Sequence, residues 1–267
     1  ASVTTTEMLV TNIQAGKSGD TRGAGRRSLL RPGKQLFRLV GVSVGPASSD
    51  GEQSTLERIR NAAIVRFGRD GFAVGLRTIA ADAGVSAGLV VQRFGSKDGL
   101  RRACDEYALQ VLREEKTKAV LDGSASTIWM QMAQVEEYAP IARYLLRCLQ
   151  DGGPTATTLI NDLIADAEQY LAAGEAAGVI RPSRDPAARA RLLAYQSLGS
   201  LLLWFSLHGS TADDDQFRIL FRRYVEEVTP PALELLAQGL LVNRSMLDDF
   251  LLYVPDPPGG PGAPAAH

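Results

Sequence analysis

Apolar residues recur at steps of three and four positions along most of the chain, and this period is that of helices with one buried face. The first such face holds Leu56, Ile59, Ala63 and Phe67. The stretch STLE at 54–57 predicts where this helix begins, because the Ser54 hydroxyl can accept a hydrogen bond from the Glu57 amide in a capping box. Gly68 and Gly71 predict where the helix ends.

Three shorter patterns follow. The first predicts a helix over about 76–82, and Gly84 suits the left-handed turn after it. Ser86 is the expected cap of a second short helix, and Ser96 is the expected cap of a longer one over about 97–118. Two short helices joined by a tight glycine turn, behind a longer supporting helix, make a helix-turn-helix.

The remainder of the chain also has helical periodicity. We expect helices near 124–138, 140–151, 155–176, 185–208, 214–228 and 231–241. Clusters of glycine and proline separate them, and TPP at 229–231 is expected to break the last pair. No segment alternates apolar and polar residues for long, so strands are not expected and the fold class is all-α.

The two ends of the chain differ from this helical part in composition. Residues 1–51 are rich in Gly, Ser, Thr and Arg without sustained periodicity, which predicts a flexible basic extension. Residues 254–267 are rich in Pro and Gly, which predicts a disordered tail. Between them we expect two domains, at 52–112 and 113–243. No apolar stretch is long enough to span a bilayer, so no membrane partner is expected.

Charge is distributed unevenly, although the formal net charge is only −1. Residues 1–50 carry +4, residues 51–118 carry +3, and residues 119–267 carry −8. A basic front on an acidic body suggests that the front meets a polyanion such as double-stranded DNA. Chance variation in surface charge is an equally good explanation of this feature taken alone.

The helix-turn-helix gives the charge a chemical context, because the second helix of this motif enters the major groove of DNA. The small residues Ala87 and Gly88 allow close approach of the main chain, and Gln92 can supply polar contacts to bases. Lys97, in the first turn of the next helix, can bind a phosphate. The predicted DNA-binding residues are Arg77, Ser86, Ala87, Gly88, Leu89, Gln92, Arg93 and Lys97. An ordinary small helical bundle is the competing interpretation.

Residues 54–107 resemble the DNA-binding domain of the tetracycline-repressor (TetR) family of transcriptional regulators. IRNAAIVRFGRDGF is similar to that family's first helix, and LRTIAADAGVSAGLVVQRFGSKDGL is similar to its helix-turn-helix and the start of its fourth helix. Glycine, capping and apolar positions agree in one register. The resemblance implies an N-terminal three-helix DNA-binding domain followed by a helical ligand-binding and dimerisation domain.

The third helix departs from the family pattern. A Lys, a Thr and a Tyr that usually contact DNA are replaced by Ala87, Leu89 and Val91. Several phosphate contacts are therefore missing, although Leu89 and Val91 can contact thymine methyl groups. Without compensation by other cations, DNA binding is expected to be weak. The basic groups that can compensate are those of the N-terminal extension and the side chains of Arg77, Arg93, Lys97 and Arg101.

The resemblance to the TetR family implies that the acidic body, residues 113–243, binds an effector and forms the dimer. Helices at about 185–208 and 214–241 are too apolar for one buried face, which favours a homodimer, although burial within the same chain explains this nearly as well. Few charges fall on the apolar faces, so a small apolar or aromatic effector is expected. The candidate ligand-binding residues are Trp129, Met132, Tyr144, Cys148, Tyr170 and Trp204. Core packing is the competing role for each of them.

These observations favour a ligand-responsive transcriptional repressor of the cytoplasm and nucleoid that binds a palindromic operator as a dimer. The alternatives are an architectural DNA-binding protein without effector, and a helical small-molecule-binding protein with weakened DNA binding. An enzyme is not expected, because the sequence has no phosphate-binding glycine loop, no metal-ligand cluster and no histidine near a candidate nucleophile. No cofactor or metal is expected, and Cys104 and Cys148 are expected to be free buried thiols.

Overall fold

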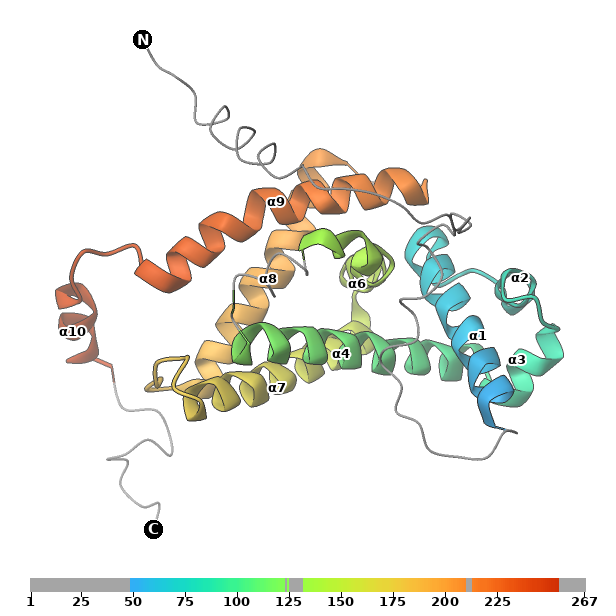
Figure 1. The fold of residues 1–267 in the computed structure, drawn as a ribbon, viewed down its shortest axis with the longest axis horizontal. Coiled ribbons are helices and arrows are strands. Elements are labelled where there is room, and N and C mark those ends of the chain that lie inside the picture. Colours follow the sequence, from blue (N-terminus) through green and yellow to red (C-terminus); the bar gives the residue numbers. More distant parts are fainter. Residues whose placement is uncertain (1–48, 123, 125–131, 210–212, 255–267) are drawn as a thin grey trace, which may run out of the picture. The chain divides into compact units, whose positions relative to one another are not determined.

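The computed structural model describes residues 49–122, 124, 132–209 and 213–254, with side chains from residue 54 onward. Its regular structure in these ranges is helical without a strand, which confirms the all-α fold class (Figure 1). The elements are α1 (Ser49–Asp70), α2 (Leu76–Asp82), α3 (Ala87–Phe94), α4 (Lys97–Leu121), the 3-10 helix η2 (Val135–Tyr138), α6 (Ala139–Asp151), α7 (Gly153–Ala176), α8 (Pro186–His208), α9 (Asp214–Gln238) and α10 (Ser245–Leu251). None of the helices in these ranges has the length and apolar character needed to cross a membrane.

Helix α1 begins earlier than its sequence pattern predicts. Its first residue is Ser49, so Ser54 lies inside the helix, and the prediction of an N-terminal capping box there is wrong. Within a helix the Glu57 amide pairs with the main-chain carbonyl four residues earlier and needs no side-chain cap. The last residues of the predicted extension, 49–51, are therefore helical, whereas residues 1–48 lie outside the described residues.

The end of α1 is set by Gly71 and not by Gly68. The helix runs to Asp70, and Gly71 follows with a φ of +82°, a conformation that favours glycine. Gly68 instead has a packing role. A Cβ atom at this position would lie 3.1 Å from the main-chain nitrogen of Tyr144 in α6, so the missing side chain lets the two backbones approach closely.

The helix-turn-helix is formed with the predicted caps. The Ser86 hydroxyl accepts a hydrogen bond from the Leu89 amide at 3.2 Å, and the Ser96 hydroxyl accepts one from the Gly99 amide at 3.0 Å. Gly84, in the turn between α2 and α3, has a φ of +66°. The serine caps and the glycine turn are therefore confirmed.

The body departs from the predicted boundaries in three places. Helix α9 continues through Pro230 and Pro231, so the predicted break at 229–231 is wrong. Both prolines are exposed, and water can bond the carbonyls that lose an amide partner. The helix expected at 124–138 ends as the 3-10 turn η2, and residues 125–131 lie outside the described residues. Helix α10 lies between the predicted second domain and the predicted tail.

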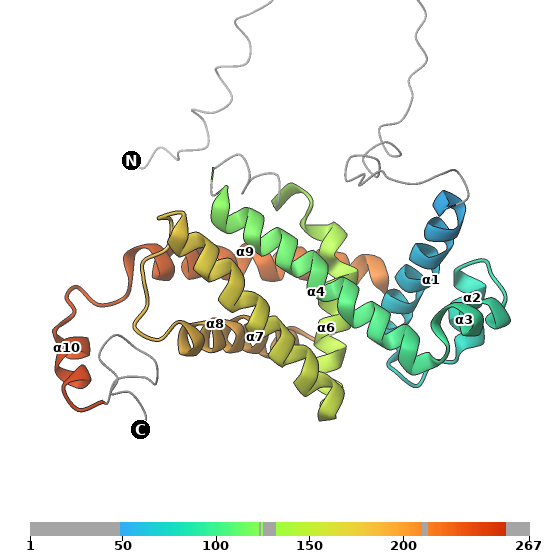
Figure 2. The same cartoon turned by 90° about the horizontal axis from the view of Figure 1, so that it is seen from below.

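Side chains from α1 to α4 form one core with α6, and it includes both free cysteines, as predicted. A second core joins α6, α8 and α9, and a third, small cluster joins α7 and α8. Helix α6 therefore belongs to both larger cores. Helix α1 packs mainly on α6, and α4 packs mainly on α7 (Figures 1 and 2). The helix-turn-helix is thus attached to the body through two helix pairs.

Candidate nucleic-acid interface

Helix α3 has one anchored side and one open side. Val90 is fully buried and Phe94 packs against the same core, which fixes the rotation of the helix about its axis. The other side exposes Gly88, Gln92 and Arg93, so the structure brings these three predicted DNA-binding residues onto one face. This side of α3 therefore carries the exposed side chains of Gln92 and Arg93 and the main chain of Gly88.

The remaining predicted contacts surround this face with different degrees of exposure. Arg77, in the first turn of α2, is exposed, and Lys97, in the first turn of α4, is half-buried. Ala87 and Leu89 are half-buried in α3. The Ser86 hydroxyl is exposed but already accepts a hydrogen bond as the cap of α3. Its predicted contact therefore competes with a capping role.

Arg101 is not part of the exposed face. Its guanidinium carbon lies 3.4 Å from the centre of the Phe72 ring, which is a cation–π contact. Its side chain is 16% exposed and lies 3.8 Å from Asp151 of α6. The suggestion that Arg101 compensates for missing phosphate contacts is therefore replaced by a packing role behind the interface. Phe72 and Arg101 line a hollow of about 130 Å³ together with Phe67, Lys97 and Asp98.

Charge pairs fix α2 on α1. The Arg66 guanidinium donates to both oxygens of Asp82, with 2.9 Å from Nη2 to Oδ1, and it also contacts Asp70 at 3.0 Å. The hydrogen bond from Arg66 holds the pKa of the Asp82 carboxyl below its usual range. Because Arg66 belongs to α1 and Asp82 to α2, their pair helps to orient α2 and the turn that follows it, whereas the pair with Asp70 lies within α1.

The five candidate ligand-binding residues that the structure describes do not converge on one cavity. Trp129 lies outside the described residues. Tyr144 and Cys148 are buried in the core of α1 to α4 and α6, whereas Trp204 is buried in the core of α6, α8 and α9. Tyr170 is half-buried beside the small cluster of α7 and α8, and Met132 is also half-buried. For the three buried side chains, the observed contacts are those of packing.

Tyr144 and Trp204 each use their polar atom within the protein. The Tyr144 hydroxyl donates to Oδ1 of Asp105 at 2.5 Å, and the Trp204 indole donates to Oε2 of Glu227 at 2.7 Å. Burial raises the pKa of the Asp105 carboxyl, and the bond from Tyr144 lowers it. Trp204 also stacks on His208, with ring centres 4.1 Å apart. These polar atoms are therefore already paired without a ligand.

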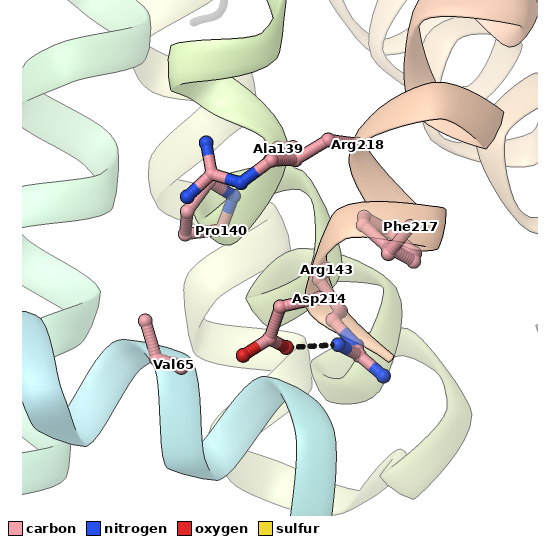
Figure 3. A pocket seen from close by; sticks show the side chains of 7 residues that line it. All are labelled: Val65, Ala139, Pro140, Arg143, Asp214, Phe217 and Arg218. Carbon is pink, nitrogen blue, oxygen red and sulfur yellow. Dashed lines mark hydrogen bonds and ion pairs between the residues drawn. The ribbon is translucent and has the colours of Figure 1, made fainter. Parts of the chain in front are cut away.

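A hollow that the sequence did not predict lies where α1, α6 and α9 meet (Figure 3). It has a volume of about 40 Å³, and its lining residues are Val65, Ala139, Pro140, Arg143, Asp214, Phe217 and Arg218. The Arg143 side chain is only 7% exposed, and it donates to Oδ1 of Asp214 at 2.6 Å. Burial lowers the pKa of Arg143, and the nearby Asp214 raises it. No periodic pattern signals a pair that is 71 residues apart in the chain.

Helix α8 carries an exposed apolar stripe. Leu203 is 64% exposed and Leu207 is 81% exposed, and Leu192 and Tyr195 continue the stripe at helical spacing. Gly199 lies within it, and a Cβ atom there would meet nothing within 4 Å. Ile219, Leu233 and Leu236 are exposed on α9. The prediction that these helices carry more apolar surface than the chain can bury agrees with these exposures.

Two family models match the chain, one on each side of residue 113. Residues 59–104 match the model described as bacterial regulatory proteins of the tetR family. Residues 136–242 match the model of the tetracyclin repressor-like C-terminal domain. Helix α10 lies beyond the second match.

A curated relative is similar over most of its own length. The HTH-type transcriptional regulatory protein RaaS of Mycobacterium tuberculosis is 46% identical over 194 residues, which are 73% of this chain and 90% of the relative. Among solved structures, a TetR-family transcriptional regulator from Pectobacterium atrosepticum is 22% identical, with 74% of this chain and 99% of that chain covered and a TM-score of 0.43. The Thermus thermophilus TetR-family repressor FadR is 23% identical, with 70% and 96% covered and a TM-score of 0.41.

Proposed function

Because the chain belongs to the TetR family of bacterial transcriptional regulators, we propose that it is a repressor that binds a palindromic operator as a homodimer and is released by a small molecule. The observation that carries this proposal is helix α3, which is anchored through Val90 and exposes a polar face. In a helix-turn-helix this face meets base edges in the major groove. A regulator of this kind acts in the cytoplasm, at the nucleoid.

The proposed DNA contacts divide into bases and phosphates. Gln92 and Arg93 are placed to read base edges, and Val91, which is 46% exposed, can contact a thymine methyl group. Arg77 and Lys97 bind phosphates on either side of the groove. With Arg101 committed to Phe72, fewer cations than expected remain for phosphates, so we propose a moderate affinity whose dependence on salt is correspondingly shallow.

The proposed dimer interface is the apolar stripe of α8 with the exposed apolar residues of α9. Leu203 and Leu207 supply the apolar surface, and Gly199 allows a second helix to approach. A two-fold axis through these helices would present two copies of α3 to half-sites one helical turn apart.

The proposed effector is a small apolar or aromatic molecule that binds the body. Met132 and Tyr170 are the preferred candidate contacts. They are half-buried, whereas Tyr144, Cys148 and Trp204 are buried in the cores. Binding would favour a spacing of the two α3 helices that no longer matches successive major grooves. An architectural DNA-binding protein without effector is the second candidate, because the two hollows described above are small and neither contains a predicted ligand-binding residue.

Selection of bound sequences from a random DNA pool tests the proposal, together with the mass of the free and bound protein. We expect an enriched site with two related half-sites and the mass of a dimer. A monomer, or a pool without enrichment at moderate salt, would contradict the proposal. Release of the selected DNA by members of a panel of apolar compounds separates a ligand-responsive repressor from an architectural protein.

A further inference from the structure

A single carboxylate joins three helices where the helix-turn-helix meets the body. Asp214 lies in the first turn of α9, where the positive end of the helix dipole stabilises its negative charge. Its Oδ1 accepts from Arg143 of α6 at 2.6 Å, and its Oδ2 lies 3.5 Å from Nη1 of Arg69 in α1. No other charge pair described above bridges three helices.

The contact with Arg143 sets Asp214 apart from an ordinary surface ion pair. Exposed ion pairs contribute little, because water screens them and the side chains must be ordered. The Arg143 guanidinium is nearly buried and also lies 4.9 Å from the centre of the Phe217 ring. The nearly buried charge of Arg143 is stabilised by a carboxylate beside it, while the Asp214 side chain itself is 42% exposed. The longer contact with Arg69 is the one that a small displacement of α1 would break first.

The contact continues from α1 into the DNA-reading helices. Arg69 shares Asp70 with Arg66, and Arg66 binds Asp82 at the end of α2. Gly68 of α1 also packs closely on the backbone of α6, which fixes the position of α1 along α6. These contacts form a continuous path from α6 and the start of α9 to α2.

We propose that Asp214 is a positioning residue that holds the helix-turn-helix in its DNA-binding orientation by joining Arg69 of α1 to Arg143 of α6 at the start of the dimerisation helix α9. The inference rests on the proposed function, because orientation matters only if two copies of α3 meet one operator. An effector that moves α6 or α9 would release α1 by breaking the contact between Asp214 and Arg69.

Two variants of the full chain test this inference. Arg69→Gln removes the contact from α1 to Asp214, at a side chain that is 24% exposed, together with the pair that Arg69 makes with Asp70. Asp214→Asn removes the shared carboxylate and leaves the pair of Arg69 with Asp70 in place. We expect each to lower the affinity for the selected operator about fivefold to tenfold, at the low end of coupling between sites. The dimer mass should stay the same, and amide hydrogen exchange should become faster in the last turn of α1. Asp215→Asn, at the exposed neighbouring position, is the matched control.

A double-mutant cycle supplies the decisive readout. If the two residues act through one contact, the double variant loses no more affinity than Asp214→Asn alone. Additive losses, or wild-type affinity and exchange in Arg69→Gln, would overturn the inference. If Asp214→Asn fails to fold, Arg69→Gln decides the question by itself. A wild-type chain that selects no DNA would instead refute the proposed function, and hydrogen exchange would still test whether Asp214 restrains α1.

Discussion

The hydroxyl of Tyr144 joins the body to the helix that follows the recognition helix. It donates to Asp105 of α4 at 2.5 Å, and the Tyr144 ring packs against the rings of Phe67 and Phe72. Burial raises the pKa of Asp105, so its ionised form is the one that most needs a donor. The hydrogen bond from Tyr144 to Asp105 thus influences both the stability of this core and the dependence of that stability on pH.

Tyr144→Phe is expected to lower the free energy of unfolding by about 1–2 kcal/mol at neutral pH, because a buried carboxylate loses its donor. A raised pKa in the folded state means that the stability from Asp105 is present at acidic pH and is lost as the pH rises through the folded pKa. The variant raises that pKa further, so its deficit should shrink in acid. Chemical denaturation across the pH range measures this. Tyr253→Phe, at a position that is 86% exposed and lies outside the stripe of α8, should show no deficit, and an equal deficit at every pH would contradict the account.

Lys97 acts, in our proposal, on a single phosphate. Lys97→Ala should weaken binding to all DNA sequences by a similar factor and reduce the salt slope by about one unit. Titration of selected and unrelated DNA at several salt concentrations measures both effects. The control is Lys118→Ala, at an exposed lysine at the other end of α4, which should leave affinity and slope unchanged. Unchanged binding in Lys97→Ala would remove the start of α4 from the interface.

At the scale of helices, the contact between α1 and α6 depends on the absence of one side chain. Gly68→Ala should raise the helix propensity of α1 by about 1 kcal/mol, yet it places a methyl group 3.1 Å from the backbone of Tyr144. Overpacking against backbone costs about 1–3 kcal/mol, so we expect net destabilisation of about 1 kcal/mol. Thermal unfolding without DNA measures it. Gly88→Ala in α3 has room for its methyl group and should be neutral or stabilising.

At the scale of the whole molecule, the apolar stripe of α8 is expected to determine the oligomeric state. Leu203→Glu places a charge at the centre of the proposed interface, and burying it without a partner is costly. We expect the dimer dissociation constant to rise at least about tenfold, which corresponds to roughly 1.4 kcal/mol, and operator binding to weaken with it. Analytical ultracentrifugation checks this. Val179→Glu alters an equally exposed apolar residue away from the stripe and should remain dimeric. A fully dimeric Leu203→Glu would place the interface elsewhere.

The sequence by itself determined the features that depend on near neighbours in the chain. Helical period, the caps Ser86 and Ser96 and the turn at Gly84 are local, because each requires only residues within one or two turns. For the same reason the sequence predicted the recognition helix and its exposed polar residues. A local signal also gave a wrong prediction at Ser54. This residue begins a capping motif, but it lies within a helix that starts at Ser49.

The tertiary structure decided everything that depends on distant partners. The sequence predicted Gly68 as the end of a helix, but in the structure it packs against the backbone of α6. The sequence suggested Arg101 as a phosphate contact, but its guanidinium packs on the ring of Phe72. Tyr144 and Trp204 are residue types that often line ligand pockets. In the structure they lie in separate cores, and each donates its polar hydrogen to a carboxylate of the protein. Side-chain type fixes what a residue is able to bind. Which partner it meets is fixed by helix packing, because packing brings together residues that are far apart in the sequence.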